Sequence, residues 1–176
     1  MSATDPDRWR EAVSYEFSML GATVRMVAQE EALHNAISES RLLHARNLSD
    51  FCSEPWRSND IKPWELYDDY DTAPEYRTLR SLIKDVETAY RSETCELVSP
   101  DGTRVFKSPQ WAFNKKLAHL THDRGIEFAN QPDSGFDYQP FMDLVVPKLM
   151  LLAAEIRRLQ KREHDLNRPP QEVRHE

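Results

Sequence analysis

The sequence predicts an all-α fold, an up-down bundle of four to five helices with a small β-hairpin inserted near residues 96–106. Apolar residues recur at spacings of three and four along most of the 176-residue chain, which is the period of helices with one buried face. Capping residues and prolines stand where these apolar stripes begin. One β-favouring pattern interrupts them, a pair of short runs that flank Pro-Asp-Gly.

The first two helices are indicated by a capping pattern and by two apolar stripes. Asp5 followed by Pro6 predicts a helix start, because an acidic cap and a proline in the first turn both suit that position. The first stripe runs from Trp9 to Val27. The second helix is expected at about 31–53. Its stripe consists of Leu33, Ile37, His44, Leu48 and Phe51.

Residues 54–71 break the helical period. They contain two prolines, four aromatic residues and several acids without a clean repeat. We expect a long ordered loop whose Trp56, Trp64 and Tyr67 cover one edge of the core. A loop of this length is often functional, although covering the core is the commoner role.

The third helix and the hairpin follow this loop. Thr72 and Glu75 have the spacing of a capping box, which predicts a helix start there. The apolar stripe after it extends to Tyr90. The Pro-Asp-Gly turn then predicts the hairpin at 96–106, which must lean on the helices because a lone two-stranded sheet is marginal.

Two further helices complete the predicted bundle. Ser108 and Pro109 predict a cap and a first turn for the fourth helix, which we expect to end before Gly125. Pro140 opens the last helix, whose stripe is rich in leucine and valine. Pro147 lies inside that stripe, so it is expected to kink the helix or delay its start.

The composition indicates a single soluble domain at 1–160 and a polar tail at 161–176, which we expect to be disordered. Apolar residues make up 39% and charged residues 30% of the chain. No apolar run approaches the roughly 18 residues that a membrane span needs, and no secretory signal is visible. Cys52 and Cys95 are too few for a disulfide framework. We therefore expect a cytoplasmic protein without a membrane partner.

The charge and the glycine content narrow the functional classes. A net charge of −7 argues against a general nucleic-acid coat protein, although an enzyme could still touch RNA at one local basic pocket. The chain has four glycines and they are not clustered, so a phosphate-binding loop or a dinucleotide fold is unsupported. No cofactor is expected.

The second helix carries a charged cluster beside its apolar stripe. Glu39, Arg46 and Asp50 fall within an arc of about 40°, because successive residues turn by about 100°. An arginine at the edge of a core needs acidic partners. The cluster is either a structural ion pair or an arginine held by carboxylates so that it faces a phosphate.

The fourth helix carries the segment NKKLAHLTHDR at 114–124. Asn114 follows the apolar face, and His119 stands about 130° away from it. Imidazole exchanges protons near neutral pH, so Arg46 and His119 would suffice for metal-independent RNA cleavage. The alternative for His119 is a local hydrogen bond. A metal shared with His122 would need a further ligand, and no metal site is expected.

Three segments together resemble a known family: ESRLLHARNLSDF, FNKKLAHLTHDRG and FDYQPFMDLVVPKLMLLAAEI. They resemble a group of small bacterial proteins with a HEPN-like helical bundle, over about residues 31–160. The resemblance implies a bundle of four to five helices that is often a homodimer. It implies either a metal-independent RNase of toxin–antitoxin, phage-defence or RNA-processing systems, with an RNA substrate and a cognate antitoxin, or a binding or scaffold module.

The chain departs from the active HEPN motif, which is Arg, four to six residues, then His. His119 matches the histidine, but the position five residues before it is Asn114. Arg46 would have to supply the guanidinium from another helix. Glu39 or Asp50 would match the supporting acid of the family. Two expectations follow: a metal-independent endoribonuclease that uses Arg46 and His119, or a non-catalytic interaction module that is dimeric or partner-bound.

Overall fold

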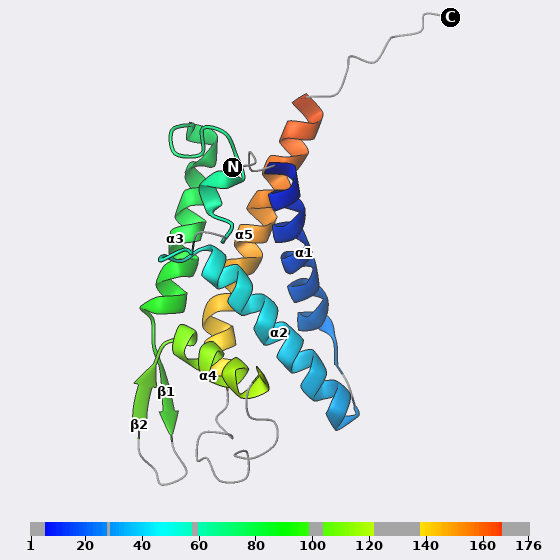
Figure 1. Ribbon diagram of the computed structural model, residues 1–176, viewed down its shortest axis with the longest axis vertical. Coiled ribbons are helices and arrows are strands. Elements are labelled where there is room, and N and C mark those ends of the chain that lie inside the picture. Colours follow the sequence, from blue (N-terminus) through cyan, green and yellow to red (C-terminus); the bar gives the residue numbers. More distant parts are fainter. Residues whose placement is uncertain (1–5, 28, 58–59, 99–103, 122–137, 167–176) are drawn as a thin grey trace, which may run out of the picture.

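The computed structural model describes residues 6–27, 29–57, 60–98, 104–121 and 138–166 (Figure 1). This part of the chain is mostly helical and contains one small antiparallel sheet, so the predicted all-α class with a hairpin is confirmed. The helices are α1 Pro6–Arg25, α2 Glu31–Phe51, α3 Arg77–Arg91, α4 Pro109–Thr121 and α5 Gln139–Leu166. The strands are β1 Cys95–Val98 and β2 Arg104–Lys107, and two short 3-10 turns are η1 Pro63–Glu65 and η2 Pro74–Tyr76.

The four long helices run alternately in opposite directions, as Figure 1 shows by their colours. In that view α1 and α3 descend, α2 and α5 ascend, and the shorter α4 crosses near the lower end. The most extensive helix–helix contacts are those of α1 with α2 and of α3 with α5. Because α5 contacts each of the other four helices, it is the central element of the bundle.

The apolar stripe of α5 explains its central place. Side chains three or four apart lie on one face of a helix, and those of α5 are buried from Phe141 to Leu159. Pro147 lies within the helix and is exposed, so the start of the helix is not delayed to it. The helix continues to Leu166, beyond the expected end of the domain at residue 160. The buried apolar residues of α5 are Phe141, Met142, Val145, Leu149, Leu152, Ala153, Ile156 and Leu159.

The start of the third helix differs from the prediction. No capping box forms at Thr72: α3 begins at Arg77, after η2. The Thr72 hydroxyl donates to the carbonyl oxygen of Asp69, at 3.4 Å. The same carbonyl also accepts the backbone amides of Thr72 and Ala73, at 3.0 and 2.9 Å. The Thr72 side chain is therefore part of the preceding turn.

The start of the fourth helix agrees with the prediction. The Ser108 hydroxyl accepts a hydrogen bond from the backbone amide of Trp111, at 3.3 Å, which is the contact of an N-terminal cap. Pro109 occupies the first position of α4. This cap orients the first turn of α4, which carries Gln110 of the groove described below.

The hairpin lies where the sequence predicts it. Glu96 pairs with Phe106 and Leu97 pairs with Val105 in an antiparallel register. Leu97 packs against the core, whereas Phe106 is exposed on the opposite face. The turn that is expected between the two strands, at 99–103, lies outside the described residues.

The loop after α2 contributes one of its three expected aromatic residues to the core. Tyr67 is buried in the core cluster. Trp64 is exposed and packs edge-on against Trp56, with ring centroids 4.8 Å apart. The indole of Trp56 donates to the carbonyl oxygen of Phe51, at 3.0 Å, which ties the loop to the end of α2.

Candidate functional site

A groove of about 820 Å³ lies between α1, the C-terminal half of α2, the segment that follows α2 and the start of α4. Ligand pockets commonly have about 300–1,000 Å³, so the groove is large enough for a specific ligand. Its lining is mixed in charge, with arginines and carboxylates from three segments. The charged residues are Arg8, Arg46 and Arg57 with Glu11, Glu16, Asp50, Glu54 and Asp60.

The groove contains three of the five residues that the sequence singles out. Arg46, Asp50 and Asn114 all line it, although Asn114 comes from a different helix. Glu39 does not line it, and it lies seven positions before Arg46, about 10 Å away along the helix axis. His119 belongs to α4, but its side chain is outside the part that the structure describes.

The pair of Arg46 and Asp50 is held in place from the core. The Nε atom of Arg46 lies 3.4 Å from Oδ2 of Asp50, an ion-pair distance. The buried Tyr90 of α3 donates its hydroxyl to Oδ1 of the same carboxylate, at 3.0 Å. Asp50 is thus fixed on both oxygens. Since Nε of Arg46 is buried, the 36% exposure of this side chain lies on its other atoms.

Burial perturbs the two acidic groups of this cluster. Burial raises the pKa of Asp50 above its ordinary value of 3.8, while the Tyr90 hydrogen bond and the Arg46 charge oppose that rise. Burial also raises the pKa of the Tyr90 phenol, and the neighbouring Asp50 carboxylate raises it further. Tyr90 therefore keeps its proton and remains the donor to Asp50.

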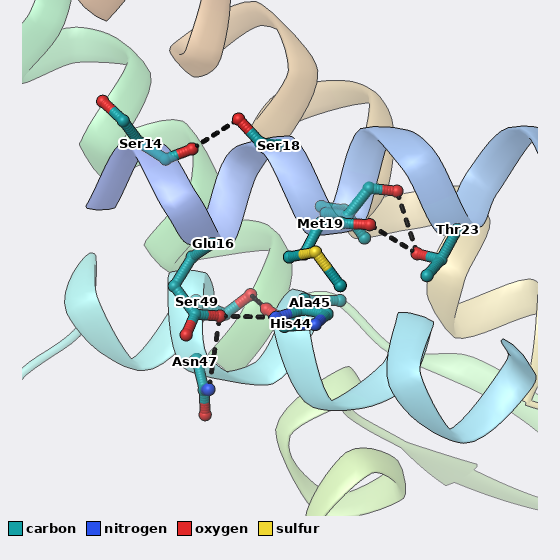
Figure 2. A network of polar contacts seen from close by, with 10 residues as sticks. Ser14, Glu16, Ser18, Met19, Thr23, His44, Ala45, Asn47 and Ser49 are labelled. Atoms are coloured by element: carbon teal, nitrogen blue, oxygen red, sulfur yellow. Dashed lines mark hydrogen bonds and ion pairs between the residues drawn. The ribbon is translucent and has the colours of Figure 1, made fainter. Parts of the chain in front are cut away.

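A second polar cluster links α1 and α2 at the same groove (Figure 2). Oε2 of Glu16 lies 2.7 Å from Nδ1 of the buried His44. The same oxygen accepts a hydrogen bond from Nδ2 of Asn47, at 3.3 Å. Glu16 and Asn47 both line the groove. Two donors from α2 therefore fix the carboxylate of α1 at the edge of the groove.

The sequence interpretation missed this second cluster. It placed His44 on the apolar stripe of the second helix, where a buried histidine needs a partner. Glu16 precedes His44 by 28 residues, so no local spacing connects them. One signal could have suggested the pair. His44 lies on the apolar stripe of its helix, and Glu16 lies beside the apolar stripe of a neighbouring helix.

Two buried polar atoms of the groove residues have no hydrogen-bond partner within the described ranges. They are Nε of Arg46 and the hydroxyl oxygen of Ser53, a residue with 6% exposure. Buried polar atoms usually find a partner in protein, water or ligand. Because Nε of Arg46 already lies at ion-pair distance from Asp50, the Ser53 hydroxyl is the one of the two atoms without a polar partner in the described residues.

The register of α4 separates the two positions that the family motif would join. Positions 114 and 119 are five residues apart, which at about 100° per residue puts them about 140° apart around the helix axis. Gln110 and Asn114 are the residues of α4 that line the groove. Among the residues of α4 whose side chains the structure describes, Gln110 and Asn114 therefore mark the side that borders the groove.

The described residues show no metal centre and no membrane span. Among them, no group of three or more His, Cys, Asp or Glu side chains is placed to hold a metal ion. His122, which the sequence analysis considered as a ligand beside His119, lies outside those residues.

No helix in the described ranges is both long and apolar enough to cross a membrane. Burial raises the pKa of the Cys52 thiol, which disfavours the reactive thiolate.

Comparisons with known proteins supply no assignment. A scan against protein-family models finds no match to this chain. Searches of curated proteins and of solved structures likewise find no significant similarity. The functional argument therefore rests on the groove itself.

Proposed function

We propose that the chain is a non-catalytic interaction module with a HEPN-like helical bundle, and that the groove binds its partner. The observation that carries this proposal is the state of Arg46. Its Nε is buried beside Asp50, Asp50 is held by Tyr90, and the rest of the guanidinium side chain borders the groove. An arginine oriented in this way is an anchor for a carboxylate or phosphate oxygen.

The charge of the groove favours a protein partner over RNA. Three arginines and five carboxylates line it, which gives a formal net charge of −2. RNA binding depends on neutralising backbone phosphates, and a surplus of carboxylates opposes it. Five residues of an α-helix also span about 140° around its axis, which counts against a joint role of Asn114 and position 119. The partner would be a second copy of this chain or a cognate protein.

Metal-independent endoribonuclease activity is the second candidate, because one observation favours it. Arg46, Asp50 and Asn114, which the sequence assigned to a catalytic site on two helices, do border one groove. In that case His119 would exchange the proton and Arg46 would stabilise the charge on the phosphate. Toxin or phage-defence biology would follow from such an activity.

An RNA cleavage assay without divalent metal separates the two candidates. The assay compares the wild type with Arg46→Ala, His119→Ala and the exposed control Arg157→Ala on a pool of varied RNA. The interaction module predicts that the RNA stays intact even at high protein concentration. Cleavage by the wild type and the control, lost in both other variants, would overturn the proposal in favour of the RNase.

A binding measurement tests the anchoring role of Arg46 directly. A blocked hexapeptide with three glutamates is titrated into the labelled protein, and backbone amide shifts are followed by NMR. We expect shifts at groove residues, and about a tenfold loss of affinity in Arg46→Gln, the cost of one charge-assisted contact. The exposed Arg157→Gln controls for lost net charge. Shifts confined to surfaces outside the groove, or equal losses in both variants, would contradict the role of Arg46.

A further inference from the structure

We infer that the partner segment of this groove is a peptide in which an acidic and a basic side chain lie close together. Arg46 takes the acidic side chain and Glu16 takes the basic one. This inference rests on the proposed interaction function and adds the chemistry of the partner. It comes from the second polar cluster, which the candidate site predicted from the sequence did not contain.

Glu16 has the geometry of a prepared cation acceptor. Both of its hydrogen-bonding contacts, from His44 and Asn47, go to Oε2. Oε1 takes no hydrogen bond or ion pair from the residues that the structure describes. The side chain is 26% exposed and borders the groove. A carboxylate held in this way loses little side-chain freedom when it binds an ammonium or guanidinium group.

Arg46 and Glu16 border the same groove but are each engaged with other residues. The ion pair of Arg46 is with Asp50, and the ion pair of Glu16 is with His44. Asn47 follows Arg46 directly in the chain and donates to Glu16 of α1, and all three residues line the groove. Because Arg46 and Glu16 are not paired with one another, a ligand group of opposite sign can approach each of them without breaking a contact between the two.

The remaining charges of the groove disfavour a ligand of one sign. A purely acidic segment meets Arg46 but also the surplus of carboxylates, and a purely basic segment meets the arginines. A segment with both signs finds complementary groups and avoids like-charge contacts, which is how charge patterns give specificity. The volume of about 820 Å³ also lies in the upper part of the range for ligand pockets. It accommodates two side chains and the backbone that joins them.

The test uses three blocked hexapeptides, since blocking removes the terminal charges. The mixed peptide alternates glutamate and arginine, the acidic peptide has glutamine in place of arginine, and the basic peptide has glutamine in place of glutamate. Each is titrated into the full chain, into Glu16→Gln and Arg46→Gln, and into the exposed controls Glu75→Gln and Arg157→Gln. NMR shifts report affinity and location, and circular dichroism together with the His44 ring signals reports folding.

The expected result is a pattern across peptides and variants. The mixed peptide binds at least about tenfold tighter than the other two, as one additional charge-assisted contact implies. Glu16→Gln reduces the mixed affinity to that of the acidic peptide and leaves acidic binding unchanged. Arg46→Gln weakens both the mixed and the acidic peptide. The two control variants bind all three peptides as the wild type does.

Three results would overturn the inference. If the acidic peptide binds through Arg46 and the mixed peptide binds no tighter, the role of Glu16 fails while the interaction function stands. If no peptide shifts the groove signals, the proposed function fails as well. Free arginine, which carries charges of both signs on one small molecule, is titrated as well. If it binds as tightly as the mixed peptide, the ligand of the groove is a small molecule with both charges and not a peptide.

Discussion

At the residue scale, Asp50 connects the groove to the core. Its carboxylate accepts from the fully buried Tyr90 on one oxygen and pairs with Arg46 on the other. About half of the side chain, 47%, is still exposed. Its pKa is nevertheless raised, because the loss of hydration, helped by the nearby charge of Asp60, outweighs the contacts with Tyr90 and Arg46. The carboxylate thus costs stability while it orients the arginine of the groove.

The pH dependence of stability tests this assignment in Asp50→Asn. A carboxyl whose pKa is raised on folding contributes stability below its ordinary value of 3.8, and the contribution is lost as pH rises through the folded pKa. Asparagine does not titrate. The unfolding free energy of Asp50→Asn should therefore improve relative to wild type as pH rises from about 4 to about 7. Urea denaturation at each pH measures this difference.

Tyr90→Phe provides the second arm of that experiment. It removes the hydrogen bond that lowers the pKa of Asp50, so the carboxyl pKa should rise further, as an NMR titration would record. A constant stability difference between Asp50→Asn and wild type over the whole pH range would refute the effect of burial on Asp50.

At the element scale, α5 shows how a stripe of apolar residues decides the place of a helix. Its buried side chains face four other helices, and its charged residues lie mostly on the other side. Leu149 is fully buried, whereas Leu151, two positions later, is 59% exposed. Two residues turn the helix by about 200°, so neighbouring leucines on one helix can differ completely in environment.

This difference predicts contrasting effects of one substitution. Leu149→Ala should lower the free energy of unfolding by about 2–5 kcal/mol, because it removes buried contacts and leaves a cavity. Leu151→Ala is the matched control and should change it by no more than about 0.5 kcal/mol. Chemical denaturation measures both. Equal effects would mean that the apolar stripe of α5 does not face the core as described.

At the scale of the whole molecule, one apolar cluster joins all five helices with the loop that follows α2. Elements that share one core generally unfold together. We therefore predict that the chain behaves as the single domain expected at 1–160. Tryptophan fluorescence and far-ultraviolet circular dichroism should give coincident urea transitions. Two separate transitions would show instead that part of the bundle unfolds independently.

Much of the fold was predictable because the signals are local. The apolar stripes predicted the helices, the Ser108 cap predicted the start of α4, and the Pro-Asp-Gly turn predicted the strands of the hairpin. Each depends on residues only a few positions apart. The predicted capping box at Thr72 was wrong because of another local contact: the Thr72 hydroxyl donates to the carbonyl oxygen of Asp69 in the preceding turn.

The candidate site was predictable only in part. Residue types and helix faces singled out Arg46, Asp50 and Asn114, and these border one groove. The same reasoning included Glu39, which shares the helix face but not the groove. The face of a helix on which a residue lies depends only on its angle around the helix axis. Whether the residue lines a groove also depends on its position along that axis and on which other elements pack there.

The sequence by itself determined the helices, most of their buried faces and the hairpin, because periodic burial and turn chemistry act within a few residues. The stripe residues Val27 and Leu33 are exceptions, since both are exposed. Only the tertiary structure decided which polar groups meet. The contact of Tyr90 with Asp50 joins residues 40 positions apart, and that of His44 with Glu16 joins residues 28 apart. Such pairs form because packing of the shared core fixes the distances and angles between the helices. These distances and angles depend on all the helices together.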